Sequence, residues 1–298
     1  MQRLAARALR YGVRLLAHRD SAMNITQAEK ATRFRALHEQ GGAFVIANSW
    51  DAGSARILAA LGFAALATSS GAAAATLGRR DGAITRGEAL AMAQAITGAT
   101  DLPVSGDLEN GFGDAPETVA QTIRLAAAAG LVGGSIEDAC DVAEAPRLYD
   151  IGHATERIAA AAEAARSLAF PFTLTARAEN FIRGKPDLGD TIRRLQAFER
   201  AGADVLFAPG LPDLAAVRAV CAAVKKPVNF MVAIRGRSFS VAELEAAGVR
   251  RISLAQSLYR AAMSGLVAAA CEVRDLGTFG YLDAALTTPE LNELLCGE

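Results

Sequence analysis

Cysteine and histidine are scarce in this sequence, and their scarcity excludes two classes of site. The four cysteines among the 298 residues are widely scattered, and no two have the spacing of metal ligands. We therefore expect reduced thiols in the cytoplasm and no disulfide scaffold. The three histidines are His18, His38 and His153. Because neither His18 nor His38 falls at the end of a predicted strand, a histidine-ligated zinc site is not expected.

The sequence also lacks an excess of charge of either sign and a long apolar segment near its start. The formal net charge is −1, so nothing favours a nucleic acid or an anionic membrane as a partner. Residues 1–22 are basic, with no acid before Asp20, but their apolar runs are too short for a secretory signal or a membrane span. We interpret them as a leader, which is either a targeting peptide or not native, or as a disordered extension. Residues 23–298 are interpreted as a single domain.

Aromatic residues are also few, at 6% of the chain, whereas abundant alanine and glycine suit close packing of helices on strands. From Gly41 onward, short apolar runs alternate with amphipathic segments of helical spacing, such as 115–129 and 188–201. Eight such units in succession predict an α/β fold, a (β/α)₈ TIM-type barrel. The predicted strands are 43–48, 64–69, 103–107, 133–137, 172–177, 205–208, 227–231 and 251–254.

Glycine and proline divide these units in an alternating way. A glycine precedes each even-numbered strand, as expected of a left-handed helix cap, whereas a proline lies at or just before the third, fifth and seventh strands. The glycines are Gly62, Gly130, Gly202 and Gly248, and the prolines are Pro103, Pro171 and Pro227. The alternation fits a closed barrel, although an open doubly wound sheet would allow similar punctuation. Residues 265–298 exceed what an eighth helix needs, so we expect a C-terminal helical extension that packs on a partner subunit.

Pairs of acids end two consecutive strands of this predicted barrel. Asp107 and Glu109 follow one apolar run, and Glu137 and Asp138 follow the next. In a parallel sheet these carboxylates meet at one edge, where they repel one another unless a cation lies among them. An all-oxygen site favours Mg²⁺ or Mn²⁺. Capping of helices is the alternative, but it does not require that Asp107 and Glu109 share one face.

Three other strand ends carry candidate binding residues, each with a structural alternative. The segment 69–71, Ser-Ser-Gly, is predicted to hold an oxyanion or a carboxylate, although such residues also form ordinary turns. Arg177 is predicted to bind a substrate carboxylate, with Glu179 orienting it, and the alternative is a buried ion pair between the two. Trp50 is predicted to line the pocket or to pack against neighbouring side chains.

Six segments carry a family resemblance through their joint order and spacing: NSWDAGSA (48–55), TSSG (68–71), LGRRDG (77–82), GDLENGFG (106–113), IED (136–138) and TARAE (175–179). Across nearly all of residues 27–276 the chain resembles the isocitrate lyase/phosphoenolpyruvate mutase superfamily. The resemblance implies a barrel whose last helix is swapped between subunits, in dimers or tetramers. It also implies Mg²⁺ and an enolate of pyruvate or a related 2-oxo acid.

The resemblance assigns a metal-binding role to four acids. Asp107 matches the family's direct metal ligand. Glu109, Glu137 and Asp81 match acids that hold the metal mostly through water. The expected cofactor is therefore Mg²⁺, or Mn²⁺ in its place.

The resemblance also assigns substrate-binding residues for a small carboxylate. Ser70, Gly71 and Ala72 match a loop that holds the carboxylate and the oxo oxygen of the substrate. Arg177 matches an arginine that contacts the substrate, and Asn229 falls where lyase relatives place an asparagine on the seventh strand.

One departure from the lyase pattern bears on the reaction. Lyase members carry Lys-Lys/Arg-Cys-Gly-His on the mobile loop after the fourth strand, and its cysteine is a catalytic acid/base. Residues 138–150 lack that motif, and Cys140 lies too close to the strand end to match the cysteine. The closing loop would then supply a proton donor or a charge partner from Tyr149, Arg147 or His153.

We therefore predict an Mg²⁺-dependent carbon–carbon lyase with Ser70, Arg177 and Tyr149 as catalytic residues. Oxaloacetate-type decarboxylation fits best, because it needs enolate stabilisation and a later proton but no starting base. Phosphoenolpyruvate mutase or phosphonopyruvate hydrolase chemistry is the runner-up, weakened by the lack of a histidine after His153. A (methyl)isocitrate-type lyase with a non-cysteine acid and a non-catalytic oxo-acid binding protein are the remaining alternatives.

Overall fold

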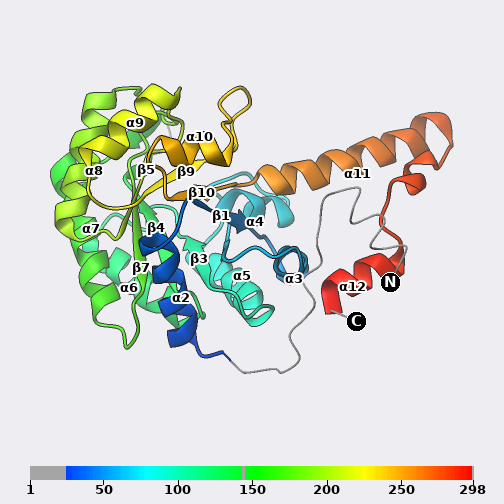
Figure 1. Ribbon diagram of the computed structural model, residues 1–298, viewed down its shortest axis with the longest axis horizontal. Coiled ribbons are helices and arrows are strands. Elements are labelled where there is room, and N and C mark those ends of the chain that lie inside the picture. Colours follow the sequence, from blue (N-terminus) through cyan, green and yellow to red (C-terminus); the bar gives the residue numbers. More distant parts are fainter. Residues whose placement is uncertain (1–24, 143–144, 297–298) are drawn as a thin grey trace.

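The computed structural model describes residues 25–142 and 145–296, and its centre is a closed barrel of eight parallel strands (Figure 1). The barrel strands are β1 (Phe44–Asn48), β2 (Leu66–Ala67), β3 (Val104–Asp107), β4 (Gly133–Glu137), β7 (Thr173–Arg177), β8 (Val205–Phe207), β9 (Val228–Met231) and β10 (Arg251–Ser253). Around the barrel they follow the order β1-β10-β9-β8-β7-β4-β3-β2. Each strand lies within one of the predicted apolar runs, so the predicted (β/α)₈ barrel is confirmed. The leader predicted at 1–22 lies outside the described residues.

Helices connect the strands and surround the barrel (Figure 1). Several begin at a capping box, as at Thr26 with Glu29 and at Thr85 with Glu88, where each side chain accepts from the other residue's backbone N–H. The helices are α2 (Gln27–Glu39), α3 (Ala52–Ala60), α4 (Ser70–Thr76), α5 (Arg86–Gly98), α6 (Pro116–Ala128), α7 (Ile151–Arg166), α8 (Leu188–Ala201), α9 (Leu214–Ala223), α10 (Val241–Ala246), α11 (Ser257–Leu276) and α12 (Thr288–Cys296), with a 3₁₀ turn η1 (Gly280–Asp283).

The core lies between the barrel strands and these helices and is rich in alanine. Helix α7 buries Ala161, Ala162 and Ala165, which allows close packing against its neighbours. Helix α2 closes the amino end of the barrel, where the fully buried Phe34 packs with Ile46 of β1. The opposite end, where the strands finish, is therefore the open one.

The parallel register gathers the predicted site residues at that open end. Asp107 pairs with Ser135, Glu137 pairs with Arg177, and Arg177 pairs with Phe207. The predicted helix caps are also confirmed, because each glycine adopts a left-handed conformation. The φ angles are 84° at Gly62, 90° at Gly130, 106° at Gly202 and 97° at Gly248.

An antiparallel hairpin lies between β4 and α7, where the sequence predicts only a mobile loop. Its strands are β5 (Ala139–Val142) and β6 (Ala145–Leu148), and Ala139 pairs with Leu148. The pairing continues at the base of the hairpin, where the Tyr149 N–H donates to the Asp138 carbonyl at 2.9 Å. The side chain of Arg147, a predicted charge partner, lies outside the described residues.

The C-terminal extension leaves the barrel. Helix α11 projects away from β10 and has no buried residue, whereas α12 turns back toward α3 (Figure 1). The Arg56 Nη1 donates to the Leu295 carbonyl at 3.1 Å and joins these two helices. Large apolar side chains remain exposed along the extension, among them Leu266, Val267 and Leu276. Among residues 25–142 and 145–296, no helix has the length and apolar character needed to cross a bilayer.

Candidate active site

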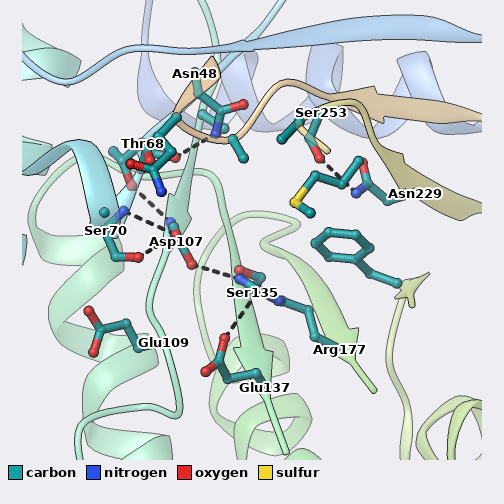
Figure 2. A pocket seen from close by; sticks show the side chains of 18 of the residues that line it. Asn48, Thr68, Ser70, Asp107, Glu109, Ser135, Glu137, Arg177, Asn229 and Ser253 are labelled. Atoms are coloured by element: carbon teal, nitrogen blue, oxygen red, sulfur yellow. Dashed lines mark hydrogen bonds and ion pairs between the residues drawn. The ribbon is translucent and has the colours of Figure 1, made fainter. Parts of the chain in front are cut away.

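A cavity of about 550 Å³ opens at the carboxyl ends of the barrel strands. Its lining includes nine charged side chains, and the carboxyl ends of the strands are the functional face of this fold. The acids are Asp81, Asp107, Glu109, Glu137 and Glu179, and the arginines are Arg177, Arg183, Arg251 and Arg260. Figure 2 shows Asp107, Glu137 and Arg177 pointing toward one another, with Ser70 beside Asp107.

Asp107, the last residue of β3, accepts hydrogen bonds on both carboxylate oxygens. Its Oδ2 accepts from the Ser70 N–H at 3.0 Å and from the Ser70 hydroxyl at 2.8 Å. Its Oδ1 accepts from Arg177 Nη1 at 3.0 Å. The Asp107 N–H donates to the Thr68 hydroxyl oxygen at 2.8 Å, which fixes the end of the strand. These contacts hold the Asp107 carboxylate in one orientation at the open end of the barrel.

Arg177, the last residue of β7, contacts three carboxylates at once. Besides Asp107, its Nη2 lies 3.2 Å from Glu137 Oε2 and 2.9 Å from Glu179 Oε1. Burial alone would lower the pKa of this guanidinium, but the carboxylates of Glu179, Glu137 and Asp107 outweigh burial and raise it. The predicted pair with Glu179 is therefore present, and the same guanidinium also lines the cavity.

Burial disfavours the ionised form of two acids that line the cavity. Burial raises the pKa of Glu137 to about 8, and Glu179 and Asp107 add to the effect although Arg177 and Arg183 oppose it. The pKa of Asp81 is also raised, first by burial and then by Asp107. Carboxyl groups in this state gain from an additional cation nearby.

The chemistry of these donors fits a hard divalent cation. Asp81, Asp107, Glu109 and Glu137 all offer oxygen and line one cavity. Among the residues that the structure describes, no three His, Cys, Asp or Glu side chains form a ready-made group of metal ligands. The Arg177 guanidinium gives a physical reason for this absence. Its nitrogens lie 3.0 Å from Asp107 Oδ1 and 3.2 Å from Glu137 Oε2, so it already contacts one oxygen of each carboxylate.

The loop predicted to bind the substrate is only partly in the cavity. Ser70 and Gly71 line it, and a Cβ added to Gly71 would come within 2.8 Å of Asp81 Oδ2. Glycine is therefore required for Asp81 to keep its position. Ala72 is fully buried behind them, and its N–H donates to the Ser69 hydroxyl oxygen at 3.3 Å.

Two other residues that were predicted to bind the substrate, Asn229 and Trp50, contact neighbouring side chains. Asn229 lines the cavity, but both ends of its side-chain amide are hydrogen-bonded. Its Nδ2 donates to Ser253 Oγ at 2.9 Å, and its Oδ1 accepts from Arg251 Nε at 2.8 Å. Trp50 does not line this cavity and packs edge-on against Tyr259, with ring centroids 5.3 Å apart.

Tyr149, the predicted proton donor, also lies outside the cavity lining. Its hydroxyl donates to Asp114 Oδ1 at 2.5 Å. Burial and this hydrogen bond raise the pKa of Tyr149 well above its ordinary value, so the hydroxyl keeps its proton. His153 packs edge-on against the Tyr149 ring at 5.2 Å and shares this location.

Arg183 is the cavity residue that sequence reasoning missed most clearly. It lies in the segment after β7, and its Nη2 approaches Glu137 Oε1 to 3.0 Å. Its position six residues after Arg177, beyond a strand end, was the available signal, because loops at this face of a barrel line the site. Arg260 on α11 also reaches the cavity, and its Nη1 donates to the Ala233 carbonyl at 3.2 Å.

Comparison with known proteins agrees with this geometry. The family model described as phosphoenolpyruvate phosphomutase matches residues 34–274. That range includes the barrel and every charged residue of the cavity.

Three related sequences cover most of the chain. An uncharacterized protein of Mycobacterium tuberculosis is 31% identical over 264 residues, which are 88% of this chain and 95% of that protein. A 2-methylisocitrate lyase of Halalkalibacterium halodurans is 30% identical and covers 68% of this chain and 67% of its own. An oxaloacetate decarboxylase of Ectopseudomonas mendocina is 32% identical and covers 67% of this chain and 69% of its own.

Solved structures show the same architecture. A candidate lyase/mutase of Burkholderia cenocepacia is 53% identical with a TM-score of 0.88, over 90% of this chain and 96% of that one. An oxaloacetate acetylhydrolase in complex with oxalate is 26% identical with a TM-score of 0.81, over 89% and 93% of the two chains. By the family match and these similarities, the chain belongs to the isocitrate lyase/phosphoenolpyruvate mutase superfamily.

Proposed function

We propose that this chain is an Mg²⁺- or Mn²⁺-dependent enzyme that cleaves a carbon–carbon bond at the carbon atom beside the oxo group of a small 2-oxo acid, in the manner of oxaloacetate decarboxylation. Because the chain belongs to this superfamily, it is an enzyme of the phosphoenolpyruvate mutase/isocitrate lyase type. The observation that carries the finer proposal is the convergence of Ser70 and Arg177 on the two oxygens of Asp107.

The donors on Asp107 are suited to a substrate with adjacent carboxylate and oxo oxygens. The Ser70 N–H and hydroxyl approach one side, and the Arg177 guanidinium approaches the other. Charge-assisted hydrogen bonds of this kind hold a carboxylate in a fixed orientation. A divalent cation bound at the acids would supply Lewis-acid stabilisation of negative charge on the oxo oxygen.

Decarboxylation makes the smallest demand on this chain. The bond to the departing carboxylate breaks without a base, because CO₂ leaves and the electron pair of the bond stays on the enolate. Fixed donors such as the Ser70 N–H stabilise the negative charge that develops. Because Tyr149 is bonded to Asp114 outside the cavity, we propose that water delivers the final proton.

Relatives of two kinds act on oxaloacetate by name. They include the decarboxylase that is 32% identical and the acetylhydrolase structure with a TM-score of 0.81. A reaction like that of 2-methylisocitrate lyase needs a group to remove a hydroxyl proton, and the lyase cysteine motif is missing from residues 138–150. We therefore rank this lyase reaction below decarboxylation.

Product formation followed by NMR tests the proposal. Oxaloacetate, phosphonopyruvate and methylisocitrate are each incubated with the purified protein and Mg²⁺, and again with EDTA. We expect pyruvate from oxaloacetate above the free-metal background, and a loss of about 100-fold in Asp107→Ala if the metal and donor set is removed.

The matched control is Asp101→Ala, which removes an exposed carboxylate that pairs with Lys30 at 3.8 Å far from the cavity. It should keep full activity. Release of phosphate from phosphonopyruvate, or of succinate from methylisocitrate, without decarboxylation of oxaloacetate would reassign the reaction to phosphorus–carbon cleavage or to a lyase.

A further inference from the structure

Arg157 on α7 is a fully enclosed charged side chain that the proposed reaction does not use. It is 1% exposed and does not line the cavity. Within the described part of the chain it forms no ion pair with a carboxylate at 4.0 Å or less. A buried guanidinium without such a partner is costly unless its N–H groups are satisfied in another way.

Main-chain carbonyls accept the hydrogen bonds of the Arg157 guanidinium. Its Nε donates to the Asp114 carbonyl at 3.1 Å, and its Nη1 donates to the Glu137 carbonyl at 3.2 Å. Its Nη2 donates to the Gly113 carbonyl at 3.0 Å and also to the Asn110 carbonyl. A planar fork can reach carbonyls in several directions at once, which a single ammonium group cannot do.

These carbonyls belong to the two segments that present acids to the cavity. One is the end of β4, where Glu137 is itself a partner. The other follows β3 and carries Glu109 at its start. That second segment is bent through left-handed conformations at Glu109 (φ 49°), Gly111 (φ 82°) and Phe112 (φ 61°). Non-glycine residues hold this conformation only where surrounding contacts impose it.

The same guanidinium also contacts the base of the β5–β6 hairpin. Its Cζ lies 4.1 Å from the centroid of the Tyr149 ring, in cation–π contact. The Tyr149 hydroxyl donates to the Asp114 carboxylate at 2.5 Å, and His153 Nε2 donates to the Asp114 carbonyl at 3.0 Å. Arg157, Tyr149 and Asp114 therefore form one unit, which we call the Arg157 clamp.

We propose that Arg157 is a positioning residue, which sets the main chain beneath Glu109 and Glu137 and joins the hairpin to both through Tyr149. The role of the two acids rests on the proposed function, whereas the positioning of their main chain does not. Arg157 acts through these segments and touches no reacting atom.

The test compares Arg157→Lys with Ile158→Ala, a matched control on the same helix. Ile158 is 2% exposed and belongs to the core, so its truncation destabilises the fold, but its side chain donates no hydrogen bond to either acid-bearing segment. Hydrogen exchange of the peptides covering 109–114 and 137 is measured for both variants, together with Mg²⁺ affinity by calorimetry and kcat and KM on oxaloacetate.

We expect Arg157→Lys to speed exchange in these peptides, to weaken Mg²⁺ binding by about 10- to 100-fold and to lower kcat by a similar factor. Ile158→Ala should lower Tm but keep wild-type exchange and affinity at these segments. Exchange and affinity in Arg157→Lys equal to those of the wild type, or equal to those of Ile158→Ala, would overturn the proposal. If the wild type does not cleave oxaloacetate, the proposed reaction fails while the exchange result still decides the role of Arg157.

Discussion

At the residue scale, the position of one predicted metal ligand depends on a glycine beside it. Gly71 leaves room for Asp81, because a Cβ at position 71 would come within 2.8 Å of the Asp81 carboxylate.

His38 lies at the closed end of the barrel, where its Nδ1 is 2.8 Å from the Phe34 carbonyl oxygen. Because a carbonyl can only accept, Nδ1 carries the proton, and Nε2 faces Arg251 Nη1 at 3.5 Å as an acceptor.

Gly71→Ala is expected to displace Asp81 and to weaken Mg²⁺ binding by about tenfold, as the loss of a supporting group near a metal does. Calorimetric titration with Mg²⁺ measures the effect. Gly98→Ala on α5 is the matched control, because nothing lies within 4 Å of its added Cβ, and it should bind Mg²⁺ like the wild type. Equal Mg²⁺ affinities in Gly71→Ala and Gly98→Ala would show that the position of Asp81 does not contribute to metal binding.

His38 is expected to make stability fall with acid. Burial, and then the nearby Arg251 charge, lower its pKa to about 3 in the folded protein, against an ordinary value of 6.5. The unfolded chain therefore binds a proton that the folded chain refuses, so stability is lost as pH falls from 6.5 toward 3. The free energy of unfolding, measured by urea titration at several pH values in that range, should depend less steeply on pH in His38→Gln than in the wild type. An equal pH dependence in the two proteins would contradict this account.

At the scale of elements, the strands and the acids at their ends could be predicted from the sequence, because parallel register alone brings Asp107 and Glu137 to one edge. The hairpin could not, since its strands are four residues each and carry no strong turn signal. Trp50 and Ala72 also follow strands, yet they do not line the cavity. Which way a side chain turns after a strand depends on tertiary packing, such as the Trp50 contact with Tyr259, and not on spacing.

The hairpin bears on one more prediction, the role of Tyr149. Tyr149→Phe removes its hydrogen bond to Asp114 but keeps the ring beside Arg157. Because the hydroxyl lies outside the cavity lining, kcat should stay within about threefold of the wild type, whereas loss of a general acid costs about 100-fold or more. Steady-state kinetics on oxaloacetate decide between the two, and a loss of the larger size would restore Tyr149 as the proton donor.

At the scale of the whole molecule, the projecting extension is the feature that one chain leaves incomplete. Leu266 and Val267 on α11 are 61% and 60% exposed, and Leu276 is 72% exposed. Apolar side chains gathered on one extension are typical of a surface that another chain covers. We propose that a second copy covers it, in the dimer or tetramer that the family resemblance implies.

Leu266→Glu combined with Val267→Glu should reduce the molecular mass in solution, because buried unpaired carboxylates oppose association. Light scattering after size exclusion measures the mass at several protein concentrations. Thr32→Glu on α2, an exposed position away from the extension, serves as the charge control. A wild-type protein that is monomeric throughout would contradict the proposal.

Calorimetric titration of oxalate, a mimic of the 2-oxo acid enolate, tests the central claim most directly. The claim is that Asp107, Ser70 and Arg177 form a metal-assisted site for adjacent carboxylate and oxo oxygens. We predict that the wild type binds oxalate with Mg²⁺ present, and that EDTA or Asp107→Ala weakens binding by about 100-fold. Oxalate binding that is independent of Mg²⁺, or that survives in Asp107→Ala, would contradict it.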